Sequence, residues 1–222
     1  RTIKVEQDID MDRIGTMARS NQPVIIVVDR TVPGKWENYV TPEQSVPDHT
    51  LDIPWESCIT MGNSFSYVPN DNYKSSKKII ETLIKIISRG GNYLLNIAPG
   101  PNGDFDQEAY YRLNDISSWM EKNESAVFAS RPIAPYHEGD YYYTKSKDGK
   151  LIHVFHTSES ENSYLKPQTG FNFAIPAGAS IKSVELLGSK EKIKWTQKDG
   201  RVFIKNVNST PHYAAVFKLS VK

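Results

Sequence analysis

The 222-residue sequence lacks the features that mark several large classes of protein. Its only cysteine is Cys58, which excludes an intrachain disulfide and a four-cysteine zinc site. Its formal net charge is +1, without the basic excess expected of a protein that binds nucleic acid. No apolar run reaches the roughly 18 residues of a transmembrane helix, so we expect no membrane span.

Two further kinds of site are not supported by the sequence. The turn at residues 99–104 contains two glycines, but no Lys-Ser/Thr pair follows as a phosphate-binding P-loop requires. His153, His156 and His212 do not have the spacing of metal ligands, so we interpret them as structural or surface histidines. The sequence therefore predicts no metal site.

The start of the chain carries no targeting information. Arg1-Thr2-Ile3-Lys4 is neither a methionine start nor a signal peptide. We expect an N-terminal part of the protein to precede it.

The most strongly patterned stretch is residues 55–97. Residues 55–60 (WESCIT) and 93–97 (YLLNI) predict two short buried strands. Between them, apolar residues at helical spacing over 77–87 predict an amphipathic helix, which Ser75 or Ser76 can begin and Gly90-Gly91 can end. Strand, helix and strand in this order form a βαβ unit with parallel strands.

The flanking segments continue the alternation of helices and strands. Residues 8–20 and 107–121 predict helices, and the five β-branched residues at 24–28 predict a central parallel strand. Asp29 and Arg30 follow that strand directly, where barrels of alternating strands and helices carry their chemistry. An isolated Asp-Arg pair fits a solvated strand end equally well.

A long loop follows at residues 31–54. It contains four prolines and four carboxylates, and loops of this length are uncommon in compact domains unless they are functional. Its aromatic residues Trp36 and Tyr39 suit either stacking on a sugar or packing against the rim of a barrel. Each carboxylate, taken alone, is more often a solvated loop charge.

The pattern changes after residues 130–136, which we interpret as a linker. Short alternating runs bounded by turn residues then predict an antiparallel β-sandwich of about 85 residues. We therefore expect two domains, at residues 1–134 and 138–222.

The central motifs resemble those of the α-L-fucosidases of glycoside hydrolase family 29. The resemblance covers roughly residues 22–136 and rests on an ordered series of motifs. They are Val28-Asp29-Arg30, Thr41-Pro42-Glu43, Trp55-Glu56-Ser57-Cys58, Gly62-Asn63-Ser64-Phe65-Ser66-Tyr67, residues 89–99 (RGGNYLLNIAP) and Pro101-Asn102-Gly103.

This resemblance implies the C-terminal half of a (β/α)8-type barrel followed by the sandwich. It implies a retaining glycosidase that uses two carboxylates and no cofactor to remove terminal α-L-fucose from fucosylated oligosaccharides or glycoconjugates. The family's nucleophilic aspartate lies before the strand at 24–28; no matching motif occurs here, so we expect it upstream of Arg1. An exported location is the family-level expectation.

Two glutamates are candidates for the acid/base. Glu43 matches family members whose acid lies in a Thr-x-Glu segment, and we favour it. Glu56 is the rival, because burial at a strand end beside an aromatic residue can raise the pKa of a carboxyl; otherwise it would orient sugar hydroxyls or hold the loop.

The resemblance also implies substrate contacts. Arg30 matches an arginine that hydrogen-bonds the fucose ring substituents, and Phe65 an aromatic placed against the C5 methyl. Trp36 and Tyr67 are weaker candidates for the aglycone side. Two other readings stay open: a non-catalytic carbohydrate-binding or degenerate scaffold, and a retaining glycosidase of other specificity, such as an α-galactosidase.

Overall fold

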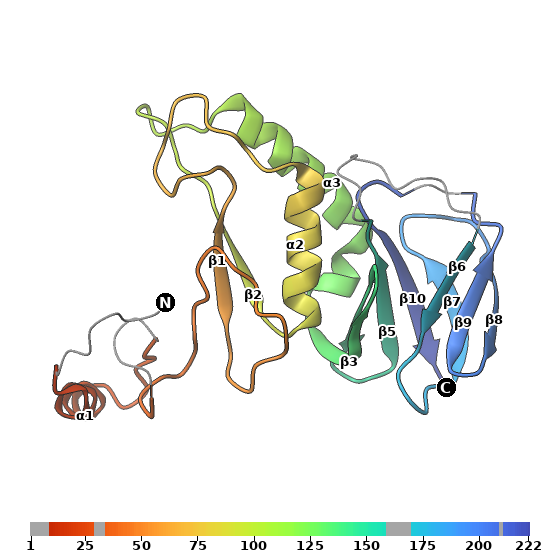
Figure 1. The fold of residues 1–222 in the computed structure, drawn as a ribbon, viewed down its shortest axis with the longest axis horizontal. Helices are drawn as coiled ribbons and strands as arrows, with labels where there is room; N and C mark the ends of the chain where they lie inside the picture. Colours follow the sequence, from red (N-terminus) through yellow and green to blue (C-terminus); the bar gives the residue numbers. More distant parts are fainter. Residues whose placement is uncertain (1–8, 29–33, 159–169, 209–210) are drawn as a thin grey trace.

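The computed structural model describes residues 9–28, 34–158, 170–208 and 211–222. Figure 1 shows an α/β part next to a β-sandwich, with the first helix set apart near the N-terminus. The helices and strands in chain order are α1 (Met11–Asn21), β1 (Glu56–Thr60), α2 (Ser76–Ser88), β2 (Asn92–Asn96), α3 (Gln107–Val127), β3 (Ser130–Glu138), β4 (Tyr141–Ser146), β5 (Leu151–His156), β6 (Gly170–Ala174), β7 (Ile181–Leu186), β8 (Lys194–Lys198), β9 (Arg201–Lys205) and β10 (Ala215–Val221).

The predicted βαβ unit is confirmed. β1 and β2 are parallel and paired from Glu56 opposite Asn92 to Thr60 opposite Asn96, with α2 as the connection between them. Ser75 caps α2 by accepting a hydrogen bond from the Lys78 N–H at 3.1 Å. The helix ends at Ser88, and Gly90, two residues further on, has a φ of 86° in the left-handed region that glycine adopts most easily.

Helix α3 continues six residues beyond the predicted end at Glu121. Its second half and α2 pack against the sandwich, and this packing joins the two parts of the molecule. The shared core contains Ile80, Ile84, Trp119, Ala126, Tyr142, Phe155, Ala214 and Val216.

The predicted antiparallel sandwich is also confirmed. One sheet has the strand order β3-β4-β5-β10-β7 and the other β6-β9-β8. Aromatic rings fill the space between them: Phe217 contacts Phe171 and Phe173 at centroid distances of 4.8 and 5.7 Å. Asp199 and Gly200, both with positive φ, form the tight turn of the β8–β9 hairpin.

The linker predicted at residues 130–136 is wrong: these residues belong to β3, which pairs with β4. β3 is an edge strand, so Pro132, which has no N–H to donate, fits there without breaking a sheet hydrogen bond. The division into domains at residues 134–138 stays a prediction and falls within this strand.

The N-terminal helix is confirmed, but the strand predicted at residues 24–28 is wrong. Asp10 caps α1 by accepting from the Arg13 N–H at 3.4 Å. Among residues 24–28, all of which the structure describes, only Val28 makes a strand-like bridge, to Tyr39. Val24 and Ile26 are 80% and 70% exposed, and no described strand pairs with their backbone.

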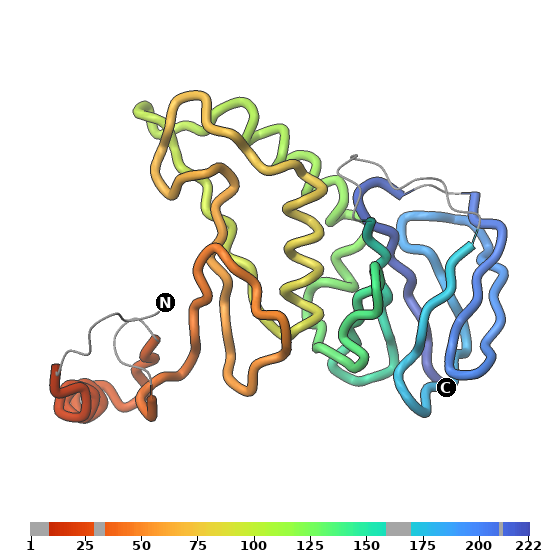
Figure 2. The backbone as a smooth tube through the Cα atoms, in the orientation of Figure 1, coloured from red at the N-terminus to blue at the C-terminus, as the bar shows by residue number. Residues whose placement is uncertain are grey.

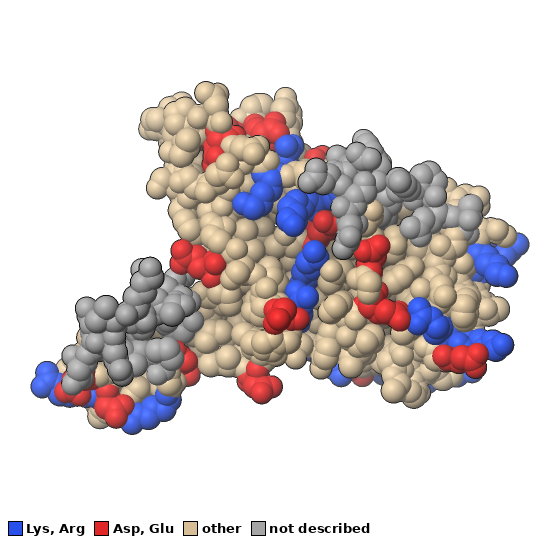
Figure 3. Space-filling view, in the orientation of Figure 1, with Lys and Arg blue, Asp and Glu red and all other residues tan. Residues whose placement is uncertain are grey.

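The loops after β1 and β2 gather beyond the carboxyl ends of these strands, as Figure 2 shows. None of the described helices is long and apolar enough to cross a bilayer. On the face drawn in Figure 3, acidic and basic side chains are interspersed.

Candidate active site

The candidate site begins with the two faces of the β1–β2 sheet. Trp55 and Ile59 pack with Ile86 of α2, so the odd-numbered positions of β1 face the helices. Because strand side chains alternate between faces, the even-numbered positions of both strands project from the opposite face, here called the inner face. The inner face consists of Glu56, Cys58, Thr60, Asn92, Leu94 and Asn96.

The segment Val40–Gln44 of the long loop runs parallel to β1 and extends the sheet. The Glu56 N–H donates to the Val40 carbonyl at 3.1 Å, and the Gln44 N–H donates to the Cys58 carbonyl at 2.9 Å. This pairing sets Glu43 opposite Cys58. Paired residues of neighbouring strands lie on the same face, so the register assigns Glu43 and Glu56 to the inner face together.

The two glutamates differ in their position along the strand. Glu56 is the first residue of β1 and Thr60 the last, so Glu56 lies at the amino end and does not end the strand as the sequence suggested. Glu43, opposite Cys58, lies two residues closer to the carboxyl end, which is about 6.6 Å at 3.3 Å per residue. In barrels of this type the chemistry takes place at the carboxyl ends of the strands.

The surroundings of the two carboxyl groups also differ. Glu43 is exposed and Glu56 is half-buried. The Glu56 carboxylate makes no hydrogen bond or ion pair with any residue that the structure describes. It is therefore available to a group that approaches the inner face.

A polar cluster closes the carboxyl end of β1. The Gln44 amide donates to the Thr60 hydroxyl at 3.1 Å, and the Lys74 ammonium donates to the carbonyls of Thr60 at 2.6 Å and Gly62 at 3.0 Å. Burial lowers the pKa of Lys74, while Asp71 acts in the opposite direction. The cluster fixes the backbone at the point where β1 enters the loop that follows it.

Asn96, opposite Thr60 at the end of β2, is a candidate that the sequence analysis did not single out. Its side-chain oxygen is buried and has no hydrogen-bond partner among the described residues. An unpaired buried acceptor is costly, so it is a natural partner for a hydroxyl group of a ligand. A polar residue at the end of the apolar run 93–97 was the signal available in the sequence.

The loop after β1 carries Phe65 and Tyr67 and is shaped by Asp71. The Asp71 carboxylate accepts hydrogen bonds from the N–H groups of Asn63 at 2.9 Å and Asn72 at 2.7 Å. A Cβ atom at Gly62 would lie 2.1 Å from the same carboxylate, so a larger residue there would displace the Asp71 side chain.

The two aromatic residues of this loop are placed differently. Phe65 is 42% exposed, whereas Tyr67 is half-buried and packs beside Gly100 of the loop after β2. Both belong to the loops that gather beyond the carboxyl ends of the strands (Figure 2).

Trp36 is placed against α1. Its indole N–H donates to Asp12 at 2.8 Å, and its ring lies so close to Gly15 that a Cβ there would be 2.5 Å away. The hydrogen bond from Trp36, followed by that from Lys35, lowers the pKa of Asp12. The structure therefore does not bring Trp36 together with Phe65 and Tyr67.

The remaining candidates concern Arg30 and metal binding. Asp29 and Arg30 lie outside the described residues, so the predicted contact of Arg30 with the sugar stays a prediction. Within the described ranges, no group of three or more His, Cys, Asp or Glu side chains could hold a metal ion.

Comparison with known proteins gives a consistent result. The family model described as alpha-L-fucosidase matches residues 2–125. Tissue alpha-L-fucosidase of Mus musculus is 30% identical over 163 residues, covering 69% of this chain and 33% of that protein. The Homo sapiens tissue enzyme is 30% identical over 169 residues, covering 72% and 34%. The chain thus spans about a third of the length of these curated relatives.

Solved structures show the same fold. Alpha-L-fucosidase isoenzyme 1 from Paenibacillus thiaminolyticus superposes with a TM-score of 0.77 at 20% identity, covering 95% of this chain and 53% of that one. A GH29 alpha-L-fucosidase from Bacteroides thetaiotaomicron gives 0.76 at 20% identity, covering 95% and 52%. These matches confirm the predicted fold class, the C-terminal half of a (β/α)8-type barrel followed by an antiparallel sandwich.

Proposed function

Because this chain belongs to the α-L-fucosidase family, we propose that the protein hydrolyses terminal α-L-fucosyl residues of fucosylated glycans. The observation that carries the proposal is the register that assigns Glu43 and Glu56 to the inner face of the β1–β2 sheet. Both glutamates lie within the residues that the family model matches.

The mechanism we propose is a double displacement with retention of configuration. One carboxylate attacks the anomeric carbon, and a second protonates the leaving oxygen and then removes a proton from water. We propose that Glu43 is the second group, and that the nucleophilic aspartate belongs to a part of the protein that precedes this chain. The Bacteroides enzyme was trapped as a covalent intermediate with 2-fluoro-fucosyl fluoride in a glutamate-to-glutamine mutant, which supports a covalent intermediate in the proposed mechanism.

Position favours Glu43 over Glu56 as the acid/base. Glu43 lies nearer the carboxyl end of β1, beside the loops where barrels bind substrate, and its exposure allows proton exchange with water. Glu56, half-buried at the amino end of β1, is better placed to accept hydrogen bonds from deeper groups.

We propose that the fucosyl unit contacts residues from both loops and both strands. Phe65 is exposed at the carboxyl end of the sheet and would contact the C5 methyl group, while Asn96 would accept a hydrogen bond from a sugar hydroxyl. Tyr67 is held against the next loop and would line the aglycone side. Arg30 would donate to the ring oxygens.

The proposal is tested by the turnover of aryl α-L-fucosides with good and poor leaving groups by the full-length protein. Glu43→Ala is expected to lose roughly 100- to 10,000-fold in kcat/KM on the poor leaving group, which needs protonation. The loss of kcat/KM on the good leaving group should be much smaller, because kcat/KM reports the first step only. On this substrate kcat itself should fall, because Glu43 also activates water for the second step. Asp52→Asn, a charge removed elsewhere in the same loop, is the matched control and should change neither rate.

Three outcomes separate the alternatives. If Glu56→Ala shows the leaving-group dependence instead, the reaction stands and Glu43 is not the acid. If the unaltered protein cleaves aryl α-galactosides in preference, the specificity is wrong. If it cleaves neither substrate, the chain is a non-catalytic scaffold. The accompanying proposal, that the protein acts outside the cytoplasm, is tested by its distribution after cell fractionation.

A further inference from the structure

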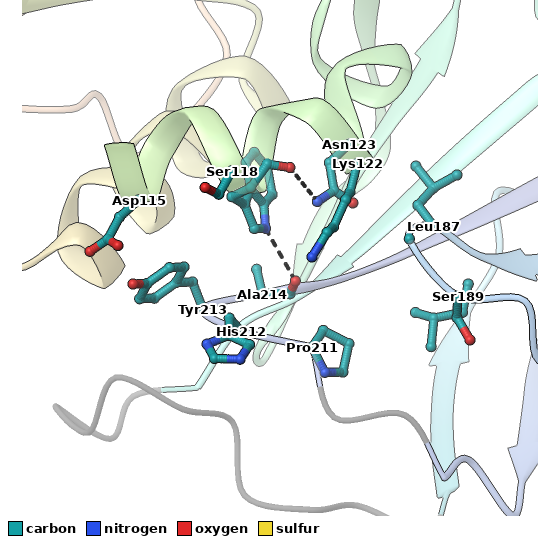
Figure 4. Close-up of a pocket in the computed structure, with 13 residues that line it drawn as sticks. Asp115, Ser118, Lys122, Asn123, Leu187, Ser189, Pro211, His212, Tyr213 and Ala214 are labelled. Carbon is teal, nitrogen blue, oxygen red and sulfur yellow. Dashed lines mark hydrogen bonds between the residues drawn. The ribbon is translucent and has the colours of Figure 1, made fainter. Parts of the chain in front are cut away.

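A cavity of about 370 Å3 lies between helix α3 and the β-sandwich, away from the inner face. It is called the junction pocket here and is drawn in Figure 4. One wall is α3; the other is formed by residues 186–189 after β7 and residues 211–214 before β10. Its volume falls within the range of small-molecule sites, which often lie where two packed units meet.

The helix wall presents polar groups from one face of α3. Asp115, Ser118 and Lys122 are spaced by three and four residues, so they lie in a row. Asp115 is fixed by a hydrogen bond from the Ser76 hydroxyl at 2.5 Å, which leaves its second oxygen free to accept from another donor.

Lys122 reaches across the cavity toward the opposite wall (Figure 4). Its aliphatic stem rests on Gly188, where a Cβ atom would lie 3.0–3.3 Å from the carbons of the lysine, so a larger residue at 188 would displace it. Its ammonium makes no hydrogen bond or ion pair with a described residue.

The opposite wall contains a strained residue. The Ala214 N–H donates to the His212 carbonyl at 2.7 Å across Tyr213, whose φ is 65°, forming a γ-turn of the rare kind with a positive central φ. A bulky residue in this conformation is strained, and such residues are found preferentially at functional sites. The Trp119 indole N–H helps to hold the turn by donating to the Ala214 carbonyl at 3.3 Å.

The result is that the Tyr213 ring stands in the junction pocket next to Asp115 and opposite Lys122 (Figure 4). The pocket offers a carboxylate that accepts, an ammonium that donates, a hydroxyl at Ser118 that does either, and an aromatic ring. Sugar hydroxyls both donate and accept, and the C–H face of a sugar packs on aromatic rings. The carboxylate and the ammonium balance in charge, which favours a neutral ligand over an anion.

We propose that the junction pocket is a second, non-catalytic saccharide-binding site. It would hold a neutral sugar unit through hydrogen bonds to Asp115, Ser118 and Lys122, with the sugar packed against Tyr213. The inference does not depend on the proposed hydrolysis, because the pocket shares no residue with the inner face.

The test is saturation-transfer NMR on the full-length protein with N-acetyllactosamine, a neutral disaccharide without fucose. We expect saturation transfer with the unaltered protein and none with Ser118→Trp, which fills the cavity. Lys122→Ala should weaken binding about tenfold, as expected for the loss of one hydrogen bond from a charged group. Lys194→Ala, an exposed lysine of β8, is the matched control and should bind normally.

Aryl α-L-fucoside turnover is measured on the same variants and should be unchanged, which separates this proposal from the catalytic one. Thermal unfolding checks that each variant is folded. If Ser118→Trp is unfolded, the binding of N-acetyllactosamine by Lys122→Ala alone tests the proposal. The proposal is overturned if the unaltered protein shows no transfer, if the signal persists in the pocket variants, or if sulfate displaces the disaccharide. The last result would identify an anion site.

Discussion

The β-sandwich and the β1–β2 sheet bury their side chains in different ways. The sandwich turns the apolar faces of two sheets toward each other, and Phe217 and Leu219 of β10 are 0% exposed. The β1–β2 sheet is covered by α2 and α3 on one face only, and Leu94 on its inner face is 47% exposed. The sandwich is thus a self-contained core, whereas the inner face leaves side chains such as Asn92 and Leu94 exposed.

A matched pair of substitutions tests this contrast most strongly. In the 222-residue chain, Leu219→Ala removes a fully buried side chain and should lower the free energy of unfolding by about 2–5 kcal/mol. Leu94→Ala makes the same chemical change on the inner face and should cost less than about 1 kcal/mol. Urea unfolding of both variants measures the difference; equal losses would mean that the inner face is covered in this chain.

The second prediction concerns pH and the core of the sandwich. Burial, followed by the nearby charge of Lys218, lowers the pKa of His153 to about 4. Below pH 6.5 His153 binds a proton in the unfolded chain, whereas in the folded chain it binds this proton only near pH 4. Stability should therefore fall between these values, by up to about 3 kcal/mol at 1.36 kcal/mol per pKa unit.

The variant His153→Leu tests whether His153 causes the loss of stability between pH 6.5 and 4. Both ring nitrogens of His153 lack a hydrogen-bond partner among the described residues, so an apolar replacement of similar size leaves nothing unpaired. The variant should keep its stability at neutral pH and lose most of the slope of unfolding free energy between pH 6.5 and 4. Some slope should remain, because burial also lowers the pKa of His156. An unchanged slope would assign the effect to other groups.

A smaller effect than that of His153 is expected in the α/β part, at the start of α2. Ser75→Ala removes the side chain that accepts from the Lys78 N–H and should cost about 1 kcal/mol in urea unfolding. Ser75→Asp can cap the helix in the same way and should retain most of the stability. If both variants lose the same amount, the cap does not account for the effect.

The sequence predicted those elements whose local pattern agrees with their packing. The apolar spacing of residues 77–87 leads directly to α2, which is capped by Ser75, one of the two serines that the sequence offered. The short apolar runs lead to β1 and β2. The register of Glu43 could not be predicted in this way, because it depends on hydrogen bonds between a proline-containing loop and β1 that leave no periodic pattern. Asn96 was missed for a similar reason: its burial without a partner exists only in the folded chain.

Two errors show how context overrides local preference. The β-branched run at 24–28 has strong strand propensity, but a strand also needs a neighbouring strand to pair with. Among these five residues only Val28 is paired, with Tyr39. Residues 130–136 contain two prolines and were interpreted as a linker, yet an edge strand tolerates proline and β3 forms there. Trp36 was considered for its aromatic ring alone; the space above Gly15 that receives it could not be read from the sequence.

The central claim, that Glu43 is the acid/base of a retaining fucosidase, is tested most directly by the product that Glu43→Ala forms with azide. The full-length variant is incubated with an aryl α-L-fucoside bearing a good leaving group and with azide, and the fucosyl azide is analysed by NMR. In a double displacement, azide attacks the covalent intermediate in place of water, so the account predicts α-L-fucosyl azide and a restored rate. Formation of the β-azide, or no rescue by azide, would contradict it.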